Sequence, residues 1–247
     1  MPSMKDQVAI VTGGTRGIGR AISRRLAELG AIPWMIYRED EEGAAEATRE
    51  ICAICPDARA LKADVASPGE AERVVAAVLA VHSHLEIVVN NAFRGGRPAK
   101  KVHETAPEEW SEDLSVNLGA PFRMSRAALP TMMAQSYGRL VFIGSLAMRG
   151  ERGRVAYVVA KNGLVGLAKT IALEYSRSGI TANVVNPGYI EAGAFLRLDP
   201  TIREAAIKRV PMARAGTSQE IAALVGHLAS HEAAYTSGQV IGVDGGM

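Results

Sequence analysis

Short apolar runs alternate with helical patterns along the whole of this 247-residue sequence. The runs are continuously apolar, which is typical of strands that helices cover on both faces. Repeated strand–helix–strand order predicts a parallel sheet with right-handed crossovers. The expected strands are Val8–Thr12, Pro33–Tyr37, Ala58–Lys62, Ile87–Asn90, Arg139–Gly144, Thr181–Asn186 and Val240–Val243. The expected helices are Gly17–Leu29, Glu41–Ile54, Gly69–Val81, Glu108–Gln135, Val155–Arg177 and Ser218–Ala229.

No linker or internal repeat interrupts this pattern, so residues 1–247 are predicted to form one α/β domain. The expected fold is a doubly wound, seven-stranded parallel sheet with helices on both faces. A hydrophobic share of 48% is enough to bury a full core. The net charge of only +2 gives no reason to expect a nucleic-acid partner.

The sequence also bears on compartment. No run of about 18 apolar residues predicts a membrane-spanning helix, and the first residues lack a signal-peptide pattern. We therefore expect neither a membrane nor a secretory location. Two cysteines cannot form a disulfide framework for a chain of this size, so the cytoplasm is the expected compartment.

Two small polar motifs resemble metal or redox sites but favour a structural role. Cys52 and Cys55 form a C-x-x-C, yet a zinc site needs two more ligands at compatible spacing. His82 and His84 lie at the end of a predicted helix, where imidazole suits the negative pole of the helix dipole. We expect no metal site.

A glycine-rich turn follows the first strand and opens the first helix. Its glycines let the backbone approach a pyrophosphate, and the helix N-terminus offers free N–H groups to that anion. The spacing G-x-x-x-G-x-G is one residue wider than the common dinucleotide fingerprint. The expected cofactor-binding residues of this turn are Gly13, Thr15, Arg16, Gly17, Ile18 and Gly19.

Two arginines indicate which dinucleotide binds. Arg16 lies inside the turn, and Arg38 follows the second strand, where an Asp or Glu usually grips the free ribose hydroxyls. An arginine there pairs instead with a 2′-phosphate. The sequence therefore favours NADPH over NADH, with Glu39 and Asp40 as the features that speak against it.

A tyrosine and a lysine follow the fifth strand at helical spacing. Tyr157 and Lys161 are four residues apart and so share one helix face, and Ser145 ends the preceding strand. A free tyrosine titrates near 10, and about 4 kcal/mol of preferential phenolate stabilisation would bring its pKa to neutrality. A neighbouring ammonium in a partly desolvated cleft, beside an oxidised nicotinamide, can supply this. We expect Ser145 to hold a carbonyl oxygen against Tyr157.

Together these motifs resemble the short-chain dehydrogenase/reductase family, over almost the whole chain, and imply a Rossmann-type fold. The family's T-G-x-x-x-G-x-G matches Thr12–Gly19, and its N-N-A motif matches Asn90–Ala92. The resemblance implies that Tyr157 donates a proton, that Lys161 lowers its pKa and binds the nicotinamide ribose, and that Asn117 positions a water. The other cofactor-binding residues that it implies are Asp64, Val65, Asn91, Ala92, Pro187, Gly188 and Ile190.

Within the family the sequence is most similar to bacterial 3-oxoacyl-[acyl-carrier-protein] reductases. The resemblance implies NADPH-dependent reduction of a 3-oxoacyl thioester, linked to acyl carrier protein or coenzyme A, to the 3-hydroxyacyl form in fatty acid biosynthesis. Four departures bear on the housekeeping role. They are Phe93 for a glycine, a longer loop from Arg94 to Glu109, and Ala192 for a threonine that bonds the nicotinamide carboxamide. The fourth is Ser136 and Ser178 for arginines that dock the carrier.

Three further features bear on substrate and assembly. Residues 94–101 and 149–154 carry a combined excess of basic side chains, which predicts a basic rim that steers an acidic carrier. Residues 192–209 are expected to form an amphipathic lid over the substrate. Helices 108–135 and 155–177 have more apolar surface than one sheet face covers, so we expect a homotetramer, or at least a homodimer.

Two alternatives remain open on the sequence alone. One is a short-chain dehydrogenase or ketoreductase that acts on a sugar, steroid, polyketide or other secondary-metabolite carbonyl. The other is a catalytically silent nucleotide sensor on the same fold. The intact set of Asn117, Ser145, Tyr157 and Lys161 argues against silence.

Overall fold

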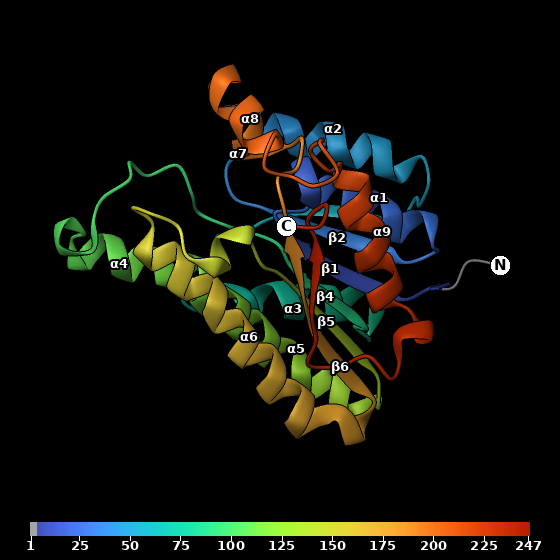
Figure 1. Cartoon of the computed structure of the whole chain (residues 1–247). Coiled ribbons are helices and arrows are strands. Elements are labelled where there is room, and N and C mark those ends of the chain that lie inside the picture. Colours follow the sequence, from blue (N-terminus) through green and yellow to red (C-terminus); the bar gives the residue numbers. More distant parts are fainter. Residues whose placement is uncertain (1–3) are drawn as a thin grey trace.

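Seven parallel strands form one sheet in the order β3-β2-β1-β4-β5-β6-β7 (Figure 1). The structure is a computed structural model that describes residues 4–247; residues 1–3 of the predicted domain and the side chain of Ala194 lie outside the description. The strands are β1 (Val8–Thr12), β2 (Ile32–Tyr37), β3 (Arg59–Lys62), β4 (Ile87–Asn90), β5 (Gly138–Ile143), β6 (Ile180–Pro187) and β7 (Val240–Val243). The predicted fold class is confirmed, and the expected strands differ from these by at most two residues at an end.

Helices cover both faces of the sheet (Figure 1). They are α1 (Gly17–Glu28), α2 (Glu41–Cys52), α3 (Glu70–His82), α4 (Pro107–Leu114), α5 (Ala120–Ala134), α6 (Val155–Tyr175), α7 (Gly193–Leu196), α8 (Pro200–Ile207) and α9 (Ser218–Ala229). Side chains of α3, α5 and α6 share one core cluster with one set of strand residues. Side chains of α1 and α9 share a second cluster with the residues that point the other way. Period-two alternation along each strand thus divides the apolar residues between two cores.

Strand order fixes where a ligand binds. β1 and β4 are neighbours, while the chain runs outward from β1 through β2 to β3 and from β4 through β5 to β7. Helical crossovers therefore leave opposite sides of the β1–β4 pair, and the loops at its carboxyl end diverge. Ligands of doubly wound sheets bind in the crevice that this reversal opens.

The predicted helix 108–135 is wrong as a single element. The chain forms α4, a π-helical segment (Ser115–Gly119) and α5 in its place. Pro121 explains the interruption, because it has no N–H to donate and its ring opposes the carbonyl four residues earlier. Widening one turn to the π form accommodates this, and such turns are frequent at functional sites.

The predicted lid, residues 192–209, contains two short helices, α7 and α8. Figure 1 shows them beyond the carboxyl ends of the central strands. Leu196, Leu198 and Ile202 are exposed there. The segment therefore presents apolar side chains that the sheet does not cover, and its closing over a substrate stays a prediction.

One helix is long and apolar enough to span a membrane by composition. It covers Val155–Ser178 with a mean hydropathy of 1.2 over its best window, although Lys161 and Lys169 interrupt the apolar sequence. In this fold the helix packs on the sheet, where Leu164, Ala168 and Ile171 belong to the core. A third of its apolar window is buried, so core packing explains part of its composition, and Val159 and Leu173 stay exposed.

The cysteine and histidine motifs lie away from the carboxyl edge. Cys52 donates from its thiol to the Ala58 carbonyl at 3.3 Å, and burial raises the pKa of Cys55. His82 accepts from the Trp34 indole at 3.1 Å. Within residues 4–247, no group of three or more His, Cys, Asp or Glu side chains is placed to hold a metal ion.

A buried arginine closes the opposite end of the sheet. Arg139 is 2% exposed and its guanidinium donates to the carbonyls of Ser230, Gly138 and Gly179 at 3.1, 2.8 and 3.0 Å. It also lies 4.2 Å from the Tyr137 ring centre. Burial lowers the pKa of Arg139, so charged hydrogen bonds must offset its desolvation.

We expect Arg139→Ala to lower the free energy of unfolding by about 3 kcal/mol, because it leaves a cavity and strips three carbonyls of a charged donor. Urea denaturation measures this. The matched control is Arg126→Ala, which removes a 68% exposed arginine 4.0 Å from Glu72 and should change the value by less than about 0.5 kcal/mol. Equal effects of the two variants would contradict the structural role of Arg139.

Candidate active site

The glycine-rich turn after β1 has a backbone that larger residues would block. Gly13 has φ of +65°, in the region that favours glycine. A Cβ on Gly19 would lie 2.0 Å from the Gly13 carbonyl oxygen and 2.6 Å from the Asn91 amide nitrogen. Arg16 is the N-cap of α1 and makes no capping hydrogen bond with its side chain. The first N–H groups of α1 therefore point outward from a tight, uncapped turn, as an anion site requires.

Thr12 and Asn91 join this turn to the end of β4. The Thr12 hydroxyl accepts from the backbone N–H groups of Asn91 and Ala92, each at 3.0 Å. The Asn91 amide donates to the carbonyls of Thr12 and Gly13 at 2.9 and 3.2 Å. Asn91 thus holds the shape of the turn in this structure. Thr12 thus fixes the position of the loop after β4 against the turn. The sequence analysis did not name it as a site residue, although its position directly before the first glycine could have identified it.

The residues expected to hold the adenosine end of the dinucleotide lie in the turn after β1 and after the ends of β2 and β3. Arg16 and Arg38 are both exposed. Arg38 donates to Glu39 at 2.8 Å, so part of its charge is already paired. Asp64 accepts from the backbone N–H of Ala66 at 3.0 Å, which orders the loop after β3. An incoming phosphate would have to compete with Glu39 for Arg38.

Tyr157, Lys161 and Ser145 meet at the carboxyl edge beside β4. Ser145 follows β5, and its hydroxyl accepts from Ala147 N at 3.2 Å. Tyr157 and Lys161 lie on α6, with the Lys161 Nζ 5.7 Å from the Tyr157 ring centre. Lys161 is 2% exposed and donates to the Ile143 carbonyl at 2.7 Å. The structure thus brings together the three residues that the sequence analysis assigned to proton transfer.

The protonation of this group differs from the expectation. Burial raises the pKa of Tyr157 above its usual value, and it outweighs a hydrogen bond from Ser145 and the positive charge of Arg154, both of which lower that pKa. Burial also lowers the pKa of Lys161 to about 8. The expected acidic phenol is therefore not a property of the protein alone, because desolvation favours the neutral form of both groups.

Asn117 has a different set of partners from the one expected. It lies fully buried in the π-helical segment. Its Oδ1 accepts from Arg94 N at 3.0 Å, and its Nδ2 donates to the carbonyls of Arg94 and Asp113 at 3.1 and 3.0 Å. The side chain fixes the loop after β4 to α4. Its predicted role of positioning a water stays a prediction.

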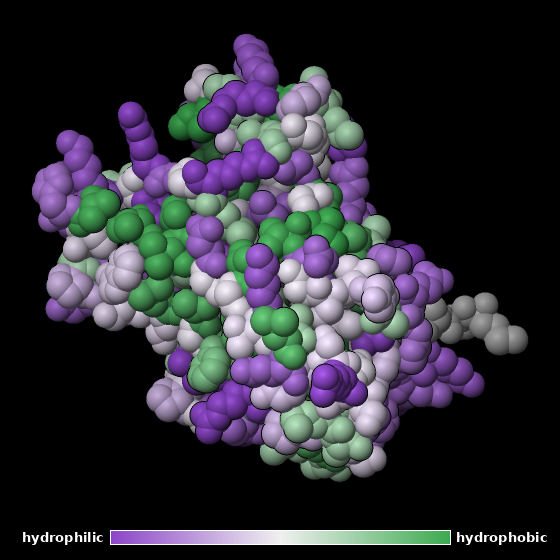
Figure 2. Space-filling model, turned by 60° about the horizontal axis from the view of Figure 1, so that its bottom comes forward, coloured by the Kyte–Doolittle hydropathy of each residue, from purple (hydrophilic) through white to green (hydrophobic). Residues whose placement is uncertain are grey.

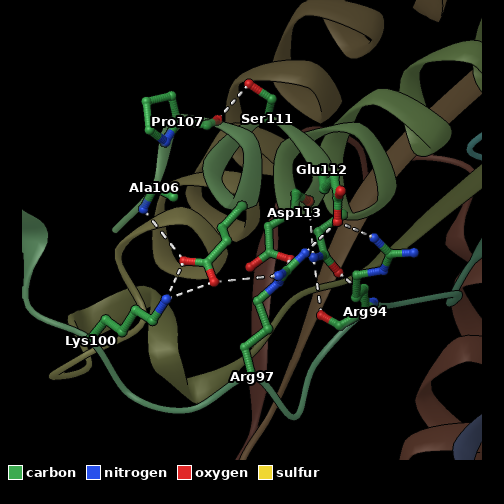
Figure 3. Close-up of polar contacts among 10 residues, drawn as sticks. Arg94, Arg97, Lys100, Ala106, Pro107, Ser111, Glu112 and Asp113 are labelled. Atoms are coloured by element: carbon green, nitrogen blue, oxygen red, sulfur yellow. Dashed lines mark hydrogen bonds and ion pairs between the residues drawn. The ribbon is translucent and has the colours of Figure 1, made fainter. Parts of the chain in front are cut away.

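Ion pairs tie the same loop to α4 (Figure 3). Arg94 contacts Glu112 at 2.9 Å, Arg97 contacts Asp113 at 3.1 Å, and Lys100 contacts Glu109 at 2.7 Å. Residues 94–113 together hold four basic and five acidic side chains. The expected basic rim is therefore wrong for this loop, since carboxylates of α4 neutralise it.

The second basic loop is partly paired as well. Arg149 contacts Asp244 at 3.2 Å and the Met247 carbonyl. Arg154 contacts Glu151 at 3.3 Å. Arg152 is exposed. Glu151 lies within the loop, but the count along the sequence missed Asp244, which comes from the end of the chain.

The remaining predicted residues line the edge around β6. Pro187 ends β6, and Gly188 donates to the Val243 carbonyl at 3.0 Å. Ile190 is 5% exposed and forms an isolated bridge with Gly216. Ala192 approaches the glycine turn, since a Cβ on Gly17 would lie 3.9 Å from it. Of the departures, Phe93 is 49% exposed and its ring packs on Gly95.

The edge fits a dinucleotide on two observations besides the turn. The side-chain Nδ2 of Asn90 and the Oδ1 of Asn186 are buried without hydrogen-bond partners. They lie near the ends of β4 and β6, which flank β5 and Ser145. Buried polar atoms without partners are rare, and an ordered water or another polar group at this edge would satisfy them.

Comparison with known families and proteins agrees with this geometry. The profile of the family described as "Enoyl-(Acyl carrier protein) reductase" matches residues 13–247. The chain is 37% identical over 246 residues to the 3-oxoacyl-[acyl-carrier-protein] reductase FabG of Escherichia coli, covering 99% of this chain and 98% of that protein. It is 35% identical over 240 residues to the enzyme of the same name from Staphylococcus aureus, covering 97% of each.

Solved structures are similar over the same extent. Levodione reductase superimposes with a TM-score of 0.92 at 32% identity, covering 98% of each chain. A blue fluorescent protein from a metagenomic library, solved in complex with NADPH, superimposes with a TM-score of 0.90 at 31% identity. That match covers 99% of this chain and 98% of the other.

We expect the burial of Lys161 to give the protein without dinucleotide a distinctive pH dependence. Between the lowered pKa of about 8 and the ordinary 10.5, the unfolded chain binds a proton that the folded chain does not. Stability from this group therefore rises with pH by about 1.4 kcal/mol per unit in that window. At pH values below this window, the buried ammonium of Lys161 lowers the free energy of unfolding.

Lys161→Met removes this titration and keeps the length of the side chain. Urea denaturation of both proteins at several pH values measures the difference in unfolding free energy. Wild type should gain on the variant as the pH rises from about 8 to about 10. A difference that is flat across this window would show that Lys161 keeps an ordinary pKa.

Proposed function

The chain belongs to the short-chain dehydrogenase/reductase family of oxidoreductases, and on that premise we propose that it reduces a 3-oxoacyl thioester to the 3-hydroxyacyl form with NADPH. The observation that carries the proposal is the meeting of Tyr157, Ser145 and Lys161 at the edge where the glycine-rich turn also lies. The names of the relatives support the substrate class.

The dinucleotide site that we propose follows the residues at the carboxyl edge. The turn Gly13–Gly19 and the N-terminus of α1 would hold the pyrophosphate. Arg16 and Arg38 would hold a 2′-phosphate, and Asp64 with Val65 would border the adenine. Residues Asn91, Ala92, Pro187, Gly188 and Ile190 would border the nicotinamide half. When bound, NADPH supplies the hydride for carbonyl reduction.

Tyr157 is the proton donor in this proposal. Ser145 lies near enough to lower the pKa of the phenol, so a carbonyl oxygen that accepts from both hydroxyls would be held in one place. The O–H bond of Tyr157 breaks as negative charge develops on that oxygen. Because burial raises the pKa of the phenol, the proton stays on Tyr157 until charge develops on that oxygen, and the phenolate that forms then needs a positive charge beside it.

Lys161 stabilises the phenolate that remains. Its ammonium lies 5.7 Å from the ring centre in a dry site, where a charge acts strongly. Asn117 supports the site by fixing the loop after β4 through Arg94. We infer that residues 192–209 close over the acyl chain with the exposed apolar side chains of α7 and α8.

Carrier and assembly are further parts of the proposal. The neutralised loop 94–101 offers an acyl carrier protein little positive charge. We therefore propose an acyl thioester substrate and leave carrier protein and coenzyme A as outcomes of the assay.

Two helices expose apolar side chains, which are Phe122 and Met133 on α5 and Val159 and Leu173 on α6. Hydrophobic surface also gathers on the face shown in Figure 2. We propose that such surface joins copies into a homodimer or homotetramer. Free cysteines fit a reducing cytoplasm.

A panel of substrates tests the activity. Oxidation of NADPH, followed by its absorbance, is measured with acetoacetyl-coenzyme A, acetoacetyl-acyl carrier protein, a cyclic diketone, a sugar, a steroid and an enoyl thioester. We expect the two acetoacetyl thioesters to give the highest kcat/KM. A higher value with the diketone, sugar or steroid supports the alternative ketoreductase, and no turnover with any of them supports the silent sensor.

Tyr157→Phe is the variant that tests the role of the phenol. We expect it to lower kcat by at least about 10³-fold, since removal of the proton donor leaves no group of the same reach. Binding of NADPH, measured by its fluorescence, should change little, because the ring stays in place. Loss of both turnover and binding would contradict the assignment.

We expect Arg38→Asp to move cofactor preference from NADPH toward NADH. The change replaces a partner of the 2′-phosphate by a carboxylate that repels it and accepts from ribose hydroxyls. The ratio of kcat/KM with the two cofactors should shift by at least about tenfold, which corresponds to about 1.4 kcal/mol. Glu39→Gln, which frees Arg38 from its pair, should move the ratio the other way. An unchanged ratio in both variants would exclude Arg38 as the selecting residue.

A further inference from the structure

A second cation lies near the Tyr157 ring, at the N-terminus of the same helix. Arg154 is the N-cap residue that precedes α6, and Lys161 lies on α6 about one turn after Tyr157. The Arg154 Cζ lies 5.4 Å from the Tyr157 ring centre, and the Lys161 Nζ lies 5.7 Å from it. A guanidinium and an ammonium therefore both lie close to the phenol ring.

The two cations differ in the pH range over which they stay charged. Lys161 is buried, donates to the Ile143 carbonyl, and has its pKa lowered to about 8. Arg154 is one-third exposed, and a guanidinium holds its proton throughout the range in which enzymes work. As the pH rises past the pKa of Lys161, Arg154 becomes the dominant positive charge beside the phenol.

Other charged groups near the phenol are largely neutralised. Arg94, Arg97 and Lys100 share with Tyr157 and Arg154 the lining of a narrow cavity, across which Glu109 and Asp113 also lie. Each of the three cations contacts a carboxylate of α4 (Figure 3). Arg154 has a looser pair with Glu151, at 3.3 and 3.5 Å. Arg154 is thus the cation of this cavity whose charge is most available to Tyr157.

We propose that Arg154 is a positioning residue of the reaction, which stabilises the negative charge left on Tyr157 when the phenol gives up its proton. In the reducing direction the O–H bond of Tyr157 breaks, an O–H bond forms on the substrate oxygen, and the phenolate keeps the electron pair. In the reverse direction the phenolate takes the proton of the substrate hydroxyl. This inference rests on the proposed function for its kinetic part.

The pH profile of alcohol oxidation tests the proposal. With NADP⁺ and the alcohol product of the best substrate, kcat/KM rises with pH until Tyr157 is ionised. Arg154→Ala should move the midpoint of this rise upward by about 0.5 to 1 pH unit, which lowers the rate on the rising limb by about threefold to tenfold. The rate at the alkaline plateau should stay nearly the same.

Two further variants separate charge from structure. Arg154→Lys keeps a cation and should restore at least about half of the shift. Arg152→Ala removes an exposed arginine two residues away and should leave the midpoint at the wild-type value. A profile of Arg154→Ala that coincides with wild type overturns the proposal. So does an equal loss at every pH, or a change in substrate KM alone, which would assign Arg154 to packing or to substrate binding.

A spectroscopic titration separates the inference from the proposed function. The tyrosinate absorbance of Tyr157 is the difference between the protein and its Tyr157→Phe variant, recorded with NADP⁺ bound and no substrate. Comparing this difference with and without Arg154→Ala should show the same upward shift. If no substrate of the panel is turned over but the shift is found, the proposed function fails and the role of Arg154 holds. If turnover is found without the shift, the role of Arg154 fails.

Discussion

The pairing of β1 with β4 determines what the rest of the molecule can do. Because the chain departs from this pair in opposite directions, the loops at its carboxyl end diverge and leave a crevice. Thr12 bridges the two strands there, with its hydroxyl holding the backbone of Asn91 and Ala92. The same hydrogen bonds fix the glycine-rich turn, so a fold-level constraint and a binding geometry depend on one side chain.

Burial of Tyr157 and Lys161 has two opposing effects: it strengthens the action of nearby charges, and it disfavours the charged form of each side chain. Tyr157 and Lys161 lie in a site dry enough for a single charge to act strongly, yet desolvation raises the pKa of the phenol and lowers that of the amine. Burial disfavours the charged form of each group, although Lys161, with a pKa of about 8, still holds its proton at neutral pH. A charge is stabilised there only when a fixed partner is within reach, and the guanidinium of Arg154 meets that condition without itself being deeply buried.

Much of the fold could be predicted because it follows from local patterns. Continuously apolar runs located all seven strands, and the spacing of Tyr157 and Lys161 on one helix face followed from helical period alone. Two things did not follow. The helix predicted over 108–135 is divided at a π-helical segment, because Pro121 lacks an N–H and its effect on the turn before it depends on packing. Burial raises the pKa of Tyr157 in the protein without dinucleotide, and the depth of a side chain is not visible in its sequence neighbours. A lowered pKa beside Lys161 and an oxidised nicotinamide stays a prediction.

The charge of the loops was the property that the sequence predicted least well. Loop 94–101 looks strongly basic when counted by itself. Three of its cations, Arg94, Arg97 and Lys100, are nevertheless paired with carboxylates nine to eighteen positions away on α4. Because these cations are paired, they attach the loop to α4 and leave it little positive charge. The pairing holds Arg94, whose backbone N–H and carbonyl in turn bind the buried amide of Asn117. The consequence is mechanical: the loop that borders Tyr157 is fixed by charge on its outer side and by one asparagine on its inner side, so the shape of the substrate cavity depends on both.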